Sequence, residues 1–373
     1  MRIFALAAAV AATSCACPAA RPTPELSSRA LQAGAEAERL AIGDLSGDGH
    51  VEIVYASGER LWVVDRDGRE LARIGAPGGI HVLETADLDG DGRDVILAGW
   101  GISREHLEAP PRMSLYRLRG GDLFEDSLPG PETSSRSQIE AILPIPAGDE
   151  PTLLLAYRIS TYVVRALRAI RGPDSWDVER IDSIYMATSY GVGDFDGSGR
   201  PDLVVGRVYG EAGGDGDAFA LRPDASRISI PTKRGVRALA VADLDGDGRD
   251  AILLADGWDR NYGEIAEARL TLARWDGSRF RTELIDEDPD QYTFWDIVAA
   301  DFTGDGSIDI VTRGDRWIRL LSRDSDGWSG RRVAAGCLDI AASSRLRAGP
   351  TYDLLALCDD GAVLHTAAST FGR

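Results

Sequence analysis

Short apolar runs rich in β-branched residues recur along the chain, and polar, glycine-containing turns separate them. In the first group of runs we expect strands at 40–44, 51–56, 61–65 and 70–74. Runs of this length bounded by turn residues are typical of antiparallel hairpins. Helical periodicity appears only at the N-terminus. The pattern predicts an all-β protein built from four-stranded antiparallel units.

Five acidic loops occupy the position between the first and second strand of such a unit. They span 44–52, 87–95, 194–202, 243–251 and 301–309, and each takes the number of its first residue as its name. Oxygen-bearing side chains recur at positions 1, 3, 5 and 9, and glycine at position 6 permits a sharp turn, as in calcium-binding loops. The predicted side-chain ligands are Asp44, Ser46, Asp48, Glu52, Asp87, Asp89, Asp91, Asp194, Asp196, Ser198, Asp202, Asp243, Asp245, Asp247, Asp301, Thr303, Asp305 and Asp309. The predicted carbonyl ligands at position 7 are His50, Arg93, Arg200, Arg249 and Ser307.

Every loop keeps three carboxylates, although Val95 and Ala251 leave position 9 apolar in loops 87 and 243. Three negative charges suit a divalent cation, and calcium tolerates irregular oxygen cages better than magnesium does. We therefore expect about five calcium sites. Asp/Gly turns that bind no metal are the alternative.

The spacing of the loops predicts the architecture. Two degenerate copies complete the series, with Pro144 and Arg345 at position 1, so that seven repeats begin at 44, 87, 144, 194, 243, 301 and 345. Repeats of roughly 40–60 residues with several short strands each are typical of propeller blades. We expect a seven-bladed β-propeller with calcium loops between the first and second strands of five blades.

The motif Asp-x-Asp-x-Asp-Gly-x-x-Asp followed by an apolar strand resembles the FG-GAP/VCBS repeat of integrin α-subunit propellers and bacterial surface proteins. The resemblance covers about residue 37 to the end and implies a calcium-binding propeller. The phrase Phe-Gly-Gly-Ala-Pro is absent, with its nearest trace at 75–79, so the bacterial exported branch is the better match. The family serves adhesion, carbohydrate binding and, in some members, polysaccharide cleavage.

The N-terminus predicts export. Residues 1–20 resemble a signal peptide, with Cys15 as a lipidation site or with ordinary cleavage near Ser14 or Ala20. We expect residues 21–36 to form either a tether or a strand that closes the ring, and in the second case residues 28–34 would form the strand. Residues 37–373 are expected to form the propeller. We expect an exported protein that is secreted, periplasmic or located on the outer surface, with a lipid anchor if Cys15 is acylated.

Two further cysteines, Cys337 and Cys358, flank the degenerate loop of the seventh repeat. On adjacent strands in an oxidising compartment they are suited to a disulfide, with a pair of buried thiols as the alternative.

The net charge of −19 argues against nucleic acid and anionic membranes as partners. We expect a monomer that touches membranes only through a lipid anchor. The four histidines are scattered, and the sequence has no nucleophile elbow, no His/Cys metal spacing and no phosphate loop.

The resemblance implies that partners bind the face opposite the calcium loops. Aromatic and charged residues in the turns of that face suit a sugar or a protein. The candidates are His81, Trp100, Arg104, Arg237, Trp258, Tyr262 and Trp295. Packing of the tryptophans between blades is the alternative. We expect non-enzymatic recognition or adhesion to a glycan or a surface protein; a calcium-dependent polysaccharide lyase or hydrolase and a structural envelope component are the alternatives.

Overall fold

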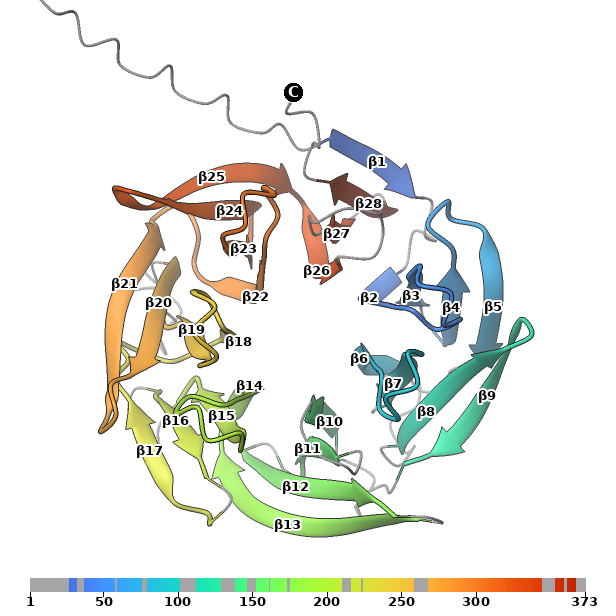
Figure 1. The fold of residues 1–373 in the computed structure, drawn as a ribbon, viewed down its shortest axis with the longest axis horizontal. Helices are drawn as coiled ribbons and strands as arrows, with labels where there is room; N and C mark the ends of the chain where they lie inside the picture. The colour runs from blue at the N-terminus through green and yellow to red at the C-terminus, as the bar shows by residue number, and fades with distance from the viewer. Residues whose placement is uncertain are drawn as a thin grey trace, which may run out of the picture.

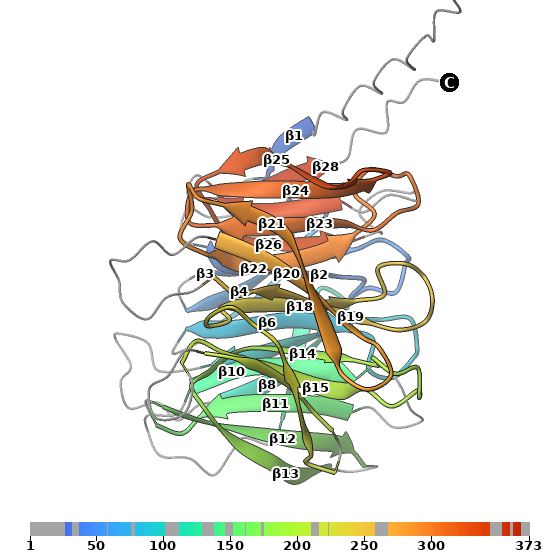
Figure 2. The same ribbon diagram turned by 90° about the vertical axis from the view of Figure 1, so that its left-hand side faces the viewer.

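The computed structural model describes residues 27–31, 37–57, 59–75, 79–100, 112–128, 138–145, 152–160, 162–172, 175–209, 216–222, 224–257, 268–343, 353–358 and 361–366. These residues form seven four-stranded antiparallel sheets and contain no helix. Figure 1 shows the sheets as blades around a central axis, and Figure 2 shows the resulting disc from its side. The prediction of an all-β, seven-bladed propeller is confirmed.

The blades follow one another in chain order, and in each the strands run from the axis outward. Blade 1 comprises β2 (Ala37–Gly43), β3 (Glu52–Ser57), β4 (Arg60–Val64) and β5 (Glu70–Gly75), and blade 2 comprises β6 (Ile80–Ala86), β7 (Val95–Trp100), β8 (Arg112–Arg119) and β9 (Asp122–Ser127). Blade 3 comprises β10 (Gln138–Ile145), β11 (Thr152–Arg158), β12 (Val163–Arg171) and β13 (Trp176–Tyr185). Blade 4 comprises β14 (Ala187–Gly193), β15 (Asp202–Arg207), β16 (Ala218–Leu221) and β17 (Arg227–Ile230). Blade 5 comprises β18 (Ala238–Ala242), β19 (Ala251–Ala255), β20 (Ala268–Trp275) and β21 (Phe280–Asp288). Blade 6 comprises β22 (Phe294–Ala300), β23 (Asp309–Gly314), β24 (Trp317–Asp324) and β25 (Gly327–Ala335). Blade 7 comprises β26 (Cys337–Ser343), β27 (Asp353–Cys358), β28 (Gly361–Thr366) and β1 (Ser27–Leu31). The four strands expected in the first blade lie within a few residues of their predicted bounds.

The ring is closed by the N-terminal segment. Strand β1 pairs antiparallel with β28, from Ser27 opposite Thr366 to Leu31 opposite Ala362. The last blade therefore takes its outer strand from the start of the chain, in the segment for which the sequence suggested a closing strand. Closure of this kind covers the edge that an open ring would expose.

The core lies between blades. Each of seven buried apolar clusters joins two neighbouring blades, including one in which Leu40 and Ile53 of blade 1 pack with Leu355 of blade 7. The middle strands of each blade contribute apolar side chains to the clusters on both sides of that blade, because successive side chains of a strand point to opposite sides of the sheet. Apolar runs such as 251–255, in which every residue is buried, follow from this packing.

In blade 7, Cys337 is disulfide-bonded, and the residue directly opposite it on β27 is Cys358. Residues 1–26, with the predicted signal and Cys15, and the degenerate loop around Arg345 lie outside the described residues. No helix in the described part of the chain is long and apolar enough to cross a membrane.

Candidate metal centres and axial cavity

Each acidic loop begins directly after the innermost strand of its blade and ends at the second strand. Loop 243, for example, leaves β18 at Ala242 and enters β19 at Ala251. Glycines at positions 4 and 6 adopt positive φ, as at Gly246 (72°) and Gly248 (81°). Only glycine takes this conformation without strain. The loops therefore fold back over their own first residue.

The first aspartate of each loop organises that turn. The Asp243 carboxylate accepts hydrogen bonds from the backbone N–H groups of Gly246 and Gly248, both at 2.9 Å. Asp44 and Asp301 accept the equivalent bonds in their loops. The position-5 carboxylate then accepts the N–H of position 7, as between Asp247 and Arg249 at 2.9 Å. These bonds keep the acidic side chains on one turn.

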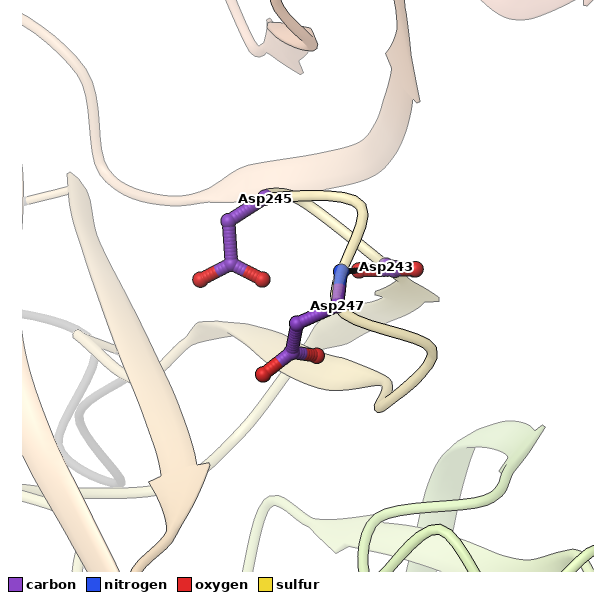
Figure 3. A group of neighbouring side chains, drawn as sticks. All are labelled: Asp243, Asp245 and Asp247. Atoms are coloured by element: carbon purple, nitrogen blue, oxygen red, sulfur yellow. Dashed lines mark hydrogen bonds between the residues drawn. The ribbon is translucent and has the colours of Figure 1, made fainter.

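Loop 243 gathers three carboxylates most closely. One oxygen from each of Asp243, Asp245 and Asp247 lies within 4.8 Å of the others, and Asp245 and Asp247 are exposed (Figure 3). Arg274 of β20 approaches the Asp245 carboxylate at 3.2 Å. An all-oxygen donor set of this charge suits a hard divalent cation.

The acid at position 9 is buried in loops 44 and 301. Glu52 Oε2 accepts the N–H groups of Leu45 (2.7 Å) and Ser46 (3.3 Å). Asp309 Oδ2 accepts those of Phe302 (3.0 Å) and Thr303 (2.8 Å). Burial raises the pKa of both carboxyl groups. The position-9 acid thus ties the start of its own loop to the second strand.

Some buried oxygen atoms of these loops have no hydrogen-bond partner among the described residues. They are Asp309 Oδ1 and Thr303 Oγ1 in loop 301 and Ser46 Oγ in loop 44. Buried polar atoms are otherwise nearly always satisfied. Positions 3 and 9 are predicted ligand positions, so this donor set fits a cation. Asp202, at position 9 of loop 194, is also partly buried, and burial raises its pKa to about 6.

Loops 87 and 243, which lack the acid at position 9, carry an aspartate at position 8 that serves the preceding blade. Asp94 Oδ2 accepts the N–H of Asp44 at 2.7 Å, and the Asp94 N–H donates to the Asp44 carbonyl at 2.8 Å. Asp250 makes the same two bonds with Asp194, at 2.8 and 2.9 Å. We call each pair of bonds a brace. Sequence reasoning missed both braces.

The predicted ligand-binding residues divide into three groups. Trp100 is only 4 % exposed and packs edge-on against Tyr116, with ring centroids 6.3 Å apart. A surface role for Trp100 is therefore wrong, because this last residue of β7 belongs to the core between blades 1 and 2. Arg104, Trp258 and Tyr262 lie outside the described residues.

The third group, His81, Arg237 and Trp295, lines a cavity at the propeller axis. The cavity has a volume of about 950 Å³, and the innermost strands of all seven blades line it. The Arg237 guanidinium lies over the Trp295 ring, 4.5 Å from its centroid. Three residues far apart in the sequence therefore meet where the blades converge.

Ion pairs line the same cavity. Arg158 of β11 donates to Glu140 of β10 at 2.6 Å, and Arg313 of β23 donates to Asp296 of β22. The Tyr190 hydroxyl is buried beside the first pair. A concave site with a few converging polar groups is the usual form of a ligand pocket.

Comparisons with known proteins agree with this geometry. Residues 194–254 match the FG-GAP-like repeat family, from the first acid of loop 194 into β19 of the next blade. Residues 194–254 are thus similar to an FG-GAP-like repeat. The resemblance seen in the sequence is thereby confirmed, while the bacterial exported type stays a prediction. An FG-GAP repeat propeller suggests an interaction module.

Among solved structures, the chain is similar to BBS1N, in the crystal structure of BBS1N in complex with ARL6DN, soaked with lead. The TM-score is 0.59 at 14 % identity, and the match covers 93 % of this chain and 97 % of that one. At this identity the likeness shows the propeller fold alone. No curated protein matches the chain in sequence.

Proposed function

We propose that the protein is an exported, calcium-binding recognition module that binds a glycan or another surface protein without chemical turnover. The observation that carries the proposal is the axial cavity, because charged and aromatic groups from separate blades converge in it. Arg237 and Trp295 offer a cation beside an aromatic ring, and Thr188 and Tyr190 add hydroxyl groups. Such groups recognise hydroxyl-bearing or charged ligands.

Calcium enters the proposal as a stabiliser of the loops. Its support is the carboxylate cluster of loop 243 and the unsatisfied buried oxygens of loops 44 and 301. Asp243, Asp245 and Asp247 would hold one ion, and Asp309 with Thr303 would contribute to another. The disulfide at Cys337 supports export, since disulfides persist in oxidising compartments.

A binding panel tests the proposal. Immobilised polysaccharides, glycans and surface-protein extracts would be incubated with mature protein in calcium and then in EDTA, scoring retention and sugar release together. We expect calcium-dependent retention without released products. Release of reducing ends or unsaturated sugars would replace the proposal by an enzymatic function, and no retention on any surface would contradict it.

A pair of variants locates the binding surface. Trp295→Ala should weaken retention by about tenfold or more, because truncating a central aromatic contact commonly costs that much affinity. Phe124→Ala is the matched control, since Phe124 is 53 % exposed on the outer strand β9. Equal affinities of the two variants would show that the ligand binds away from the propeller axis. Melting curves of both would exclude a folding defect.

A further inference from the structure

The acidic loops divide into two groups by the residue at position 3. Loops 87, 194 and 243 carry an aspartate there, whereas loops 44 and 301 carry Ser46 and Thr303. Each of the three aspartates lies in an ion pair with an arginine of its own blade. The pairs are Arg117 with Asp89 at 2.9 Å, Arg222 with Asp196 at 3.6 Å and Arg274 with Asp245 at 3.2 Å. We call these three residues the loop arginines.

The loop arginines occupy one structural position. Arg274 directly follows Ala273, which pairs across the sheet with Ile252, the first residue after the motif. The other two loop arginines are placed in the same way on β8 and after β16. The equivalent residues beside loops 44 and 301 are Asp65 and Ser322. Arginine therefore occupies this position where position 3 is acidic and not where position 3 carries a hydroxyl group.

Further contacts hold two of the arginines beside their loops. Arg117, whose side chain is 20 % exposed, also donates to Asp126 of β9 at 3.0 Å. The Arg222 guanidinium lies 5.9 Å from the centroid of the Trp275 ring. A guanidinium with a second partner stays near its loop when the position-3 carboxylate turns toward another cation.

Position 3 is satisfied differently in the loops that have a hydroxyl there. Ser46 Oγ and Thr303 Oγ1 are buried and have no hydrogen-bond partner in the described part of the chain. In loop 301 the same holds for Oδ1 of Asp309, a residue that is only 1 % exposed. Buried oxygens in this state indicate a ligand that the chain does not supply. Where a loop arginine is present, the chain itself supplies a positive charge at position 3.

We propose that the loop arginines compete with calcium for the position-3 carboxylate and so lower the calcium affinity of loops 87, 194 and 243. The inference rests on the proposed calcium binding and names residues that set its strength. Without calcium, the guanidinium offsets repulsion among the three acids of its loop. With calcium bound, its positive charge opposes that of the ion.

Arg274→Gln tests the competition in loop 243, because glutamine keeps a hydrogen-bonding group and removes the charge. Protection of the loop 243 amides from hydrogen exchange would be followed through a series of calcium buffers. We expect the calcium concentration at half protection to fall about fivefold, the effect in water of one charge roughly 8 Å from a divalent ion. In EDTA the same amides should exchange about twofold to fivefold faster, because the ion pair is lost.

The sign of the calcium effect separates competition from a structural role. If Arg274 only supported the loop, its loss would raise the calcium concentration at half protection. Arg274→Lys keeps the charge and should resemble wild type in both measurements. Arg279→Gln is the matched control, since Arg279 has a 69 % exposed side chain and lies 3.8 Å from Asp276 in the turn after β20. A half-protection concentration that is unchanged or higher in Arg274→Gln, or that falls equally in Arg279→Gln, would overturn the proposal.

Salt provides a second check on the charge. Raising the ionic strength from about 0.1 M to about 1 M shortens the screening length from about 10 Å to about 3 Å. The difference in calcium affinity between wild type and Arg274→Gln should therefore shrink. A difference that persisted at high salt would show that the arginine acts through its shape, against the proposal.

The wild-type titration distinguishes the two levels of failure. Protection of loop 243 that does not respond to calcium in the wild type would refute both the calcium site and the competition. Protection that responds to calcium equally in wild type and Arg274→Gln would refute the competition and leave calcium binding standing.

Discussion

The acidic loops of blades 1, 2, 4 and 5 are joined in two pairs, whereas loop 301 of blade 6 stands by itself. In each pair the later loop supplies an aspartate at position 8, Asp94 or Asp250, that binds the first residue of the earlier loop. In loop 301 position 8 is Ile308, which packs against the apolar core between blades 5 and 6. Position 8 therefore faces the preceding blade in each case, by hydrogen bonds or by apolar packing.

The same comparison explains where the last acid is placed in loops 44, 87, 243 and 301. Glu52 and Asp309 at position 9 bind their own loops, and Asp94 and Asp250 at position 8 bind a neighbour. The two positions lie on opposite faces of the strand that follows, because side chains alternate along a strand. A shift of one residue thus converts a bond within a blade into a bond between blades.

Removal of calcium should have the largest effect on this arrangement. If calcium occupies the loops, a concentration about a thousandfold above its Kd adds roughly 4 kcal/mol per site. Excess EDTA should then lower the melting temperature by more than about 10 °C. Differential scanning calorimetry measures this shift, with magnesium as the control that restores little of it. An unchanged melting temperature would contradict calcium as a stabiliser.

Hydrogen exchange in EDTA sharpens the comparison. Amides of loops 44 and 87 should become exposed together, and those of loops 194 and 243 likewise, because the braces link them. The amides of loop 301 should open independently. Independent opening of all five loops would show that the braces carry no coupling.

Asp309→Asn should have the next largest effect. The carboxylate is buried and accepts two N–H groups, so its loss should reduce the free energy of unfolding by about 2 kcal/mol. Urea denaturation measures the change, and hydrogen exchange should locate it at Phe302 and Thr303. Asp326→Asn, on the exposed turn after β24, is the control and should change stability little. Faster hydrogen exchange in blade 1 of this variant as well would show that loop 301 is coupled to the loop of another blade.

Most of the fold could be predicted because it is periodic. The loops repeat at blade spacing, and each is followed by an apolar strand, so one blade read in detail gives the others. The missing outer strand of blade 7 could be anticipated because a ring must close. Local sequence is sufficient for these features, since turns and alternation determine them within a few residues.

The site was harder to predict because its contacts join distant residues. Trp100 was expected in an exposed turn beside Gly99, yet it ends β7 and its ring packs on Tyr116. The charges of the axial cavity come from strands of different blades, so that no short motif contains them. Inner-strand positions such as Glu84 and Asp339 resemble ordinary polar interruptions until the ring brings them together.

The braces did leave a trace in the sequence. Glycine precedes the two loops that receive a brace, at Gly43 and Gly193, and alanine precedes the other three. A Cβ atom at Gly43 would lie 2.8 Å from Asp94 Oδ2, and one at Gly193 would lie 3.0 Å from Asp250 Oδ2. The pairing of Gly-Asp in one loop with aspartate at position 8 of the next is therefore a signal for the brace that can be sought in other repeats.

Asp250→Asn should have the smallest effect on stability and the most specific one. The asparagine can still accept one hydrogen bond, so the loss should be about 1 kcal/mol, but the charge that fixes the first residue of loop 194 disappears. Hydrogen exchange should quicken at Asp194 in the preceding blade, and calcium affinity of loop 194 should fall although all its ligands remain. Asp94→Asn is the reciprocal control, because it should act on Asp44 and leave Asp194 unchanged. If each variant instead loosened only its own loop, position 8 would be a local residue and the two pairs would be an accident of packing.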